Sequence, residues 1–153
     1  MSENKFRGKS VRTGGWIYGY YVKHETRQTC PIGEDKLTPD EIKRLIVFDS
    51  FADWNMPKTL QAIEVIPETV GQYTGLKDKS GKEICEGDIV RLKLPYDKRF
   101  NTTGTIVFDE ETVSLRLKIR ESTEAYVLYK NVTDNMEIIG NIHENPELLE
   151  VSP

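Results

Sequence analysis

The chain has 153 residues, of which 37% are hydrophobic and 30% charged, and its formal net charge is −4 at pH 7. This length suits one domain or two small ones, and the apolar content is sufficient for a buried core, which excludes an intrinsically disordered chain. The negative net charge excludes a nucleic-acid-binding domain of the strongly basic kind.

The sequence shows no pattern typical of a signal peptide or of a membrane-spanning segment. Residues 1–5 lack the apolar core of a signal peptide, and no apolar run approaches the roughly 20 residues of a membrane span. Cys30 and Cys85 lie far apart and neither belongs to a C-x-x-C pair, so the sequence predicts two reduced thiols and no zinc knuckle. We therefore expect a cytoplasmic protein without a membrane partner.

The first predicted element is a β-hairpin, in which a turn at residues 13–15 joins the β-prone segments 5–11 and 16–22. Period-two alternation places three aromatic side chains on one face of its second strand: Trp16, Tyr18 and Tyr20. This row fits either a stacking platform for nucleic-acid bases or packing in a core or subunit interface. The mixed charges of residues 23–27, without a flanking cationic groove in the sequence, favour packing.

A short helix is predicted at residues 39–45. Thr38 can cap the free amides, Pro39 suits the first helical position, and Glu41 completes a capping box. The sequence becomes β-prone immediately afterwards, so we place the boundary near residues 45–46.

Two weaker features complete this part of the chain. Residues 53–57 form a predicted irregular turn that ends at a proline, and we expect Trp54 to anchor it. Residues 61–66 are a short β-prone run, which a proline also closes. The first part of the chain is therefore predicted to be β-rich.

The most specific stretch is residues 70–90, with the sequence VGQYTGLKDKSGKEICEGDIV. It resembles the signature of the YopX family, which is carried mainly by bacteriophages and prophages. Residues 5–8, 15–19 and 138–146 also resemble the opening and closing segments of that family. The chain departs from the family at residues 8–9, at Ser80, where Asn is usual, and at Cys85, where an aromatic residue is common, which weakens any redox role for Cys85.

The resemblance implies a mainly β protein, α+β as a whole, with no established activity. It implies an SH3-like small β-barrel in residues 77–153 and a smaller β-rich part with the short helix in residues 1–76. The sequence pattern supports a β structure here independently of the resemblance. Val90, Leu92 and Leu94 alternate with polar side chains, as in a half-buried antiparallel strand. Four more β-prone segments follow at the spacing of a small barrel or sandwich: 104–108, 113–117, 125–129 and 136–139.

No catalytic, metal or cofactor site is predicted. Residues 109–111 are three adjacent carboxylates, which are more typical of a solvated hairpin tip than of a cation site. His24 and His143 are the two histidines of the chain, and neither lies in a zinc or catalytic-triad pattern. The glycine-rich segments lack the lysine arrangement of a phosphate-binding loop. We expect a protein that is not an enzyme and has no cofactor.

The predicted function is that of a phage- or prophage-encoded accessory protein in the host cell cytoplasm. We expect a non-enzymatic module that binds a protein partner, for which a second copy of the chain is a candidate. The alternative is nucleic-acid binding through the basic stretch 91–99 and the aromatic hairpin at 16–21. Its candidate contacts are Arg91, Lys93, Lys98, Arg99, Trp16, Tyr18 and Tyr20.

Overall fold

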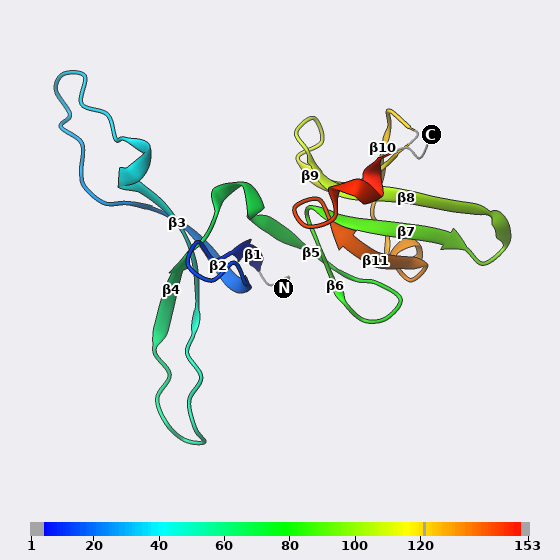
Figure 1. The fold of residues 1–153 in the computed structure, drawn as a ribbon, viewed down its shortest axis with the longest axis horizontal. Helices are drawn as coiled ribbons and strands as arrows, with labels where there is room; N and C mark the ends of the chain where they lie inside the picture. The colour runs from blue at the N-terminus through cyan, green and yellow to red at the C-terminus, as the bar shows by residue number, and fades with distance from the viewer. Residues whose placement is uncertain (1–4, 121, 151–153) are drawn as a thin grey trace. The chain divides into compact units, whose positions relative to one another are not determined.

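The computed structural model describes residues 5–120 and 122–150, without the side chains of residues 98–100. It is mainly β, as predicted, and its strands are antiparallel (Figure 1). The described residues divide into two compact units, 5–70 and 71–150. Strand β5 (Gly71–Lys77), which contains the predicted division after residue 76, belongs to the second unit.

The first unit begins with the predicted hairpin, which is confirmed. Strands β1 (Phe6–Lys9) and β2 (Trp16–Glu25) pair in a register that sets Arg7 opposite Tyr18 and Lys9 opposite Trp16. The buried Ser10 holds the turn, because its hydroxyl accepts hydrogen bonds from the amides of two turn residues at 3.2 Å each.

Two further strands extend this sheet in the order β4-β3-β2-β1. Strand β3 (Ile42–Asp49) pairs with β2, and β4 (Leu60–Glu64) pairs with β3. An isolated antiparallel bridge between Ser10 and Val65 joins the end of the hairpin to the chain just after β4. Ile46 and Val65 are the buried apolar residues that the described part of this unit contributes to its core.

The helix predicted at residues 39–45 is wrong beyond its first turn. A 3-10 turn, η1 (Pro39–Glu41), is present, and the Thr38 amide donates to Oε2 of Glu41 at 2.8 Å, as expected for a capping box. From Ile42 onward the chain is strand β3, because its backbone groups pair with β2 and β4 on either side. Pairing with distant strands outweighs the local helix-start signal.

The second unit contains a hairpin and a five-stranded sheet. The hairpin consists of β5 and β6 (Glu83–Cys85), and the sheet has the order β10-β9-β8-β7-β11. The sheet strands are β7 (Asp88–Leu94), β8 (Asp97–Asp109), β9 (Ser114–Ile119), β10 (Ala125–Val127) and β11 (Met136–Asn141). Short helical turns are η2 (Pro67–Thr69) at the end of the first unit, and α1 (Lys130–Thr133) and η3 (Pro146–Leu149) in the second.

One face of the five-stranded sheet carries the main core. Alternate residues of the strands pack there with Ile84 of β6, and the buried members of this cluster are Ile84, Val90, Leu92, Ile106, Leu117 and Met136. The prediction that Val90, Leu92 and Leu94 face inward is confirmed. The opposite face of β7 carries Arg91, which is half-buried, and Lys93, which is exposed.

The closed SH3-like barrel is not confirmed. Strands β10 and β11 form the two edges of the five-stranded sheet and do not pair with each other in the described residues. Strand β10 has only three residues, and the chain then passes through α1 before β11 pairs with β7. The sheet is therefore open between these two edges.

Candidate interaction surfaces

The loop between β3 and β4 lies at the end of a hairpin (Figure 1). Several of its apolar side chains are exposed to solvent. Phe51 is 92% exposed, Trp54 94% and Met56 62%, and Leu60 at the start of β4 is 73% exposed. We call the three residues within the loop, Phe51, Trp54 and Met56, the tip cluster. The prediction that Trp54 anchors the turn is wrong, because its side chain lies almost entirely outside the packed structure.

Hydrogen bonds close the base of this loop. The Ser50 amide donates to the Thr59 carbonyl at 2.7 Å, and the two hydroxyls lie 2.9 Å apart. A turn follows in which the Met56 amide donates to the Asp53 carbonyl at 3.0 Å, with Asn55 in the left-handed region at φ 63°. The backbone that carries the tip cluster is thus shaped by its own hydrogen bonds.

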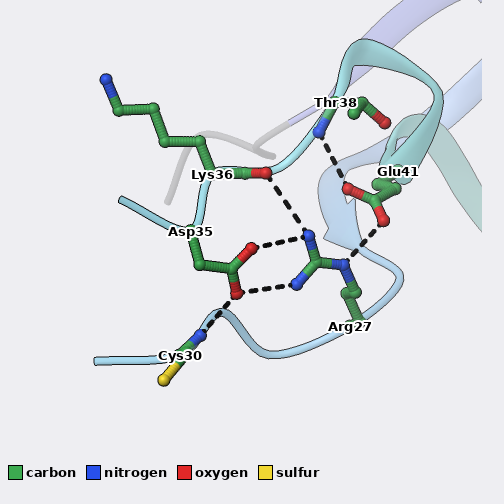
Figure 2. Close-up of polar contacts among 6 residues, drawn as sticks. All are labelled: Arg27, Cys30, Asp35, Lys36, Thr38 and Glu41. Carbon is green, nitrogen blue, oxygen red and sulfur yellow. Dashed lines mark hydrogen bonds and ion pairs between the residues drawn. The ribbon is translucent and has the colours of Figure 1, made fainter. Parts of the chain in front are cut away.

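The long loop between β2 and β3 is held by charge rather than by apolar packing. Figure 2 shows Arg27 donating from its two terminal nitrogens to the two Asp35 oxygens, each at 3.0 Å, and from Nε to Glu41 at 2.6 Å. The Cys30 amide also donates to Asp35 at 2.7 Å. These contacts lower the pKa of Asp35 to about 2, chiefly through the Arg27 hydrogen bonds and then the Cys30 amide.

The electrostatics of this loop follow from the same contacts. Hydrogen bonds from Arg27 and from the Thr38 amide lower the pKa of Glu41, and the two carboxylates raise the pKa of Arg27. Three ionised groups are therefore fixed in one arrangement at neutral pH. The charged group of Arg27 forms ion pairs with those of Asp35 and Glu41, which indicates a structural role instead of a catalytic one. We call these three residues the Arg27 clamp.

The aromatic row on β2 has cationic neighbours that the sequence did not reveal. The guanidinium carbon of Arg7 lies 4.7 Å from the Trp16 ring centroid, and Nζ of Lys9 lies 5.6 Å from it. Cations over an aromatic face are attracted to it. Trp16 is therefore partly covered by the chain's own side chains, while Tyr18 and Tyr20 remain 45% and 63% exposed.

The predicted nucleic-acid contacts fall in both compact units. Trp16, Tyr18 and Tyr20 belong to the first, whereas Arg91 and Lys93 lie on β7 of the second. The side chains of Lys98 and Arg99 lie outside the described residues. Each unit therefore contributes its own group of predicted contact residues.

Of the remaining polar candidates, Asp109 has a structural role. Asp109 accepts hydrogen bonds from the Thr112 hydroxyl at 2.5 Å and the Glu111 amide at 3.3 Å, and it pairs with Arg116 at 3.4 Å. It thus organises the β8–β9 turn. Cys30, which is exposed, and Cys85, which is buried, do not form a disulfide with each other. Over residues 5–120 and 122–150, no three His, Cys, Asp or Glu side chains lie close enough to hold a metal ion, and no helix is long and apolar enough to span a membrane.

Residues 5–150 match the model of the YopX protein family. The chain belongs to the YopX family. The crystal structure of protein EF1440 from Enterococcus faecalis is similar to it, with 26% sequence identity, a TM-score of 0.48, and coverage of 98% of this chain and 100% of that one. No curated protein matches the chain.

Two aspartates in the stretch that resembles the YopX signature are buried and organise the second unit. Oδ1 of Asp78 accepts hydrogen bonds from the Ser80 and Lys82 amides at 2.9 Å, and Oδ2 accepts one from the Ile138 amide of β11 at 3.1 Å. Asp88 accepts the Cys85 amide at 2.8 Å. These YopX signature residues serve the fold, and the exposed tip cluster lies outside the signature.

Proposed function

We propose that the protein is a non-enzymatic interaction module that inserts its tip cluster into an apolar pocket of a protein partner. The exposure of Trp54 and Phe51 at the end of one hairpin carries the proposal. Single exposed apolar residues are ordinary, but several gathered on one projection are typical of an interaction surface. Tryptophan is also enriched among the residues that dominate binding energy at interfaces.

The geometry of the loop supports this role. Ordering a flexible loop on binding costs free energy, and a loop that is already shaped costs less. The Ser50–Thr59 hydrogen bonds and the turn at Asp53 supply that order in the free protein. As the family resemblance implies, we place this role in a phage- or prophage-encoded accessory protein inside the host cell.

The test is recovery of partners by the tagged full-length chain from nuclease-treated lysate of the bacterium that carries its gene. We expect the Phe51→Ala/Trp54→Ala variant to lose proteins that the wild type recovers. Its matched control is Ile32→Ala/Tyr96→Ala, which removes two side chains that are 84% and 82% exposed elsewhere. Identical sets of recovered proteins from the wild type and the tip variant would refute the proposal.

A second copy of the chain is one candidate partner. In that case, light scattering gives a mass above the 17.6 kDa of one chain, and Phe51→Ala/Trp54→Ala returns the mass to that value. A single species of monomer mass across concentrations would exclude self-association and leave a different protein as the partner.

We also propose an SH3-like arrangement for the second unit. Its support is the meander of β7, β8 and β9, followed by a helical turn and the return of β11 to pair with β7. Strand pairings measured by amide-to-amide NMR contacts test it, since closure requires contacts between the β5–β6 hairpin and an edge of the sheet.

A further inference from the structure

The face of the five-stranded sheet opposite the main core gathers cations from two strands that the sequence separates by about 25 residues. Antiparallel partners point to the same side of a sheet. Arg91 is opposite Thr103, Lys93 is opposite Asn101, and Lys118 is opposite Thr105. The register thus places Lys118 of β9 on the same face as Arg91 and Lys93 of β7.

Arg120 extends this group just after β9. Its amide donates to the Thr103 carbonyl at 3.1 Å, which continues the β8–β9 pairing by one residue. Its guanidinium donates to the Glu150 carbonyl. We call Arg91, Lys93, Lys118 and Arg120 the basic strip, with Thr103 between its two halves.

Among the described residues, carboxylates adjoin the basic strip at Arg91 and at Lys118. Glu137, opposite Arg91 on β11, pairs with Lys79 at 3.4 Å. Asp109, at the far end of β8, pairs with Arg116 at 3.4 Å. Neither of these two ion pairs includes a member of the basic strip. Four carboxylates line one hollow with Lys118: Asp109, Glu110, Glu111 and Glu124. The cations of the strip that lie outside this hollow are Arg91, Lys93 and Arg120.

We propose that the basic strip binds the phosphate backbone of nucleic acid, independently of base sequence. Neighbouring strands lie about 4.8 Å apart and alternate residues of a strand about 7 Å apart, so the spacing of the cations is within reach of consecutive phosphates. Thr103 and Asn101 lie among them and offer hydroxyl and amide donors, which also bind phosphates. This activity is separate from the tip cluster and does not depend on the proposed protein interaction.

The test measures binding of the full-length chain to a fluorescein-labelled 20-base-pair DNA duplex by anisotropy, with a single-stranded 20-mer of dT as a second arm. We expect binding at about 50 mM salt, with a logarithmic salt slope of about −3.6 on the duplex, because each of four neutralised phosphates contributes about −0.9. Arg91→Ala/Lys93→Ala/Lys118→Ala should weaken binding at least tenfold and bring the slope to about −0.9, because Arg120 remains. The arm that binds more tightly identifies the form of nucleic acid recognised.

Two matched variants make the result specific. Lys77→Ala/Lys82→Ala/Lys130→Ala removes the same charge from exposed lysines of the same unit and should change the affinity less than twofold. Arg91→Lys/Lys93→Arg/Lys118→Arg keeps the charge and should keep the salt slope. Absence of binding to both probes by the wild type, or an equal loss in the two alanine variants, would overturn the proposal; Phe51→Ala/Trp54→Ala should bind DNA as the wild type does.

Discussion

Arg27 shows how one side chain can order a loop that has little apolar packing. Both Asp35 oxygens and one Glu41 oxygen accept its hydrogen bonds, and the guanidinium geometry suits this fork of acceptors. The loop between β2 and β3 thereby acquires a fixed base, although most of its residues are exposed. Its arrangement depends on ionisation, which makes it testable by pH.

The clamp should respond to acid at an unusually low pH. The folded pKa of Asp35, about 2, is below its ordinary value of 3.8, so ionised Asp35 stabilises the loop above about pH 4 and this stabilisation is lost as the pH falls through about 2. An NMR titration of the Cys30 amide should therefore show a midpoint near 2. In Arg27→Met the midpoint should rise toward 3.8.

Lys36→Met is the control for this titration. It removes a positive charge from the same loop, but in Figure 2 the Lys36 side chain points away from Asp35, and only its backbone carbonyl contacts Arg27. The midpoint should stay near 2. Equal midpoints in the wild type and Arg27→Met would show that the Arg27 hydrogen bonds do not set the ionisation of Asp35.

At the scale of elements, Asp78 joins the β5–β6 turn to β11. It is 5% exposed, and Asp78→Ala leaves the amides of Lys82 and Ile138 without their acceptor. We expect the free energy of unfolding to fall by about 1–3 kcal/mol, the usual cost of unsatisfied buried donors. Urea denaturation of the purified chain measures this change.

Two comparisons sharpen the Asp78 prediction. Asp78→Asn keeps one acceptor oxygen and should lose less stability than Asp78→Ala. Glu110→Ala, at an exposed position of the β8–β9 turn, should change the unfolding free energy by less than about 0.5 kcal/mol. A loss in Glu110→Ala as large as that in Asp78→Ala would contradict a specific role for the aspartate.

Elements with a strong local pattern were predictable from the sequence, and features that depend on register were not. The first hairpin and β7 follow from alternation and a glycine turn, both of which are local signals. The helix at 39–45 failed because pairing with β2 decides the conformation from Ile42 onward. The sequence could not show that Lys118 shares a face with Arg91 or that Arg7 lies over the Trp16 ring. The register of distant strands has no signature in composition or spacing.

At the scale of the whole molecule, the two units differ in the core that each contains. The main cluster, from Ile84 to Met136, lies within the second unit, whereas the described part of the first has Ile46 and Val65 as its buried apolar residues. Stability scales with buried apolar area. The second unit is therefore expected to be the more stable one.

Two fragments test this expectation. Residues 71–153 expressed alone should give a dispersed amide NMR spectrum and a cooperative urea transition, whereas residues 1–70 should unfold at a lower urea concentration. Full-length protein measured in the same buffers is the reference. A collapsed spectrum for residues 71–153, beside a dispersed one for the full chain, would show that the second unit depends on residues outside it.

The Arg27 clamp has a practical consequence for anyone who wishes to label this protein. Because the ends of the loop are fixed by Arg27, Asp35 and Glu41, the segment beyond them, around Gly33, can be lengthened without pulling on β2 or β3. Lengthening a closed loop raises its closure entropy only slowly, and exposed loop tips tolerate insertions best. A short epitope or fluorophore-binding peptide inserted after Gly33 would thus report on the protein in cells without replacing any residue of the tip cluster or of the basic strip.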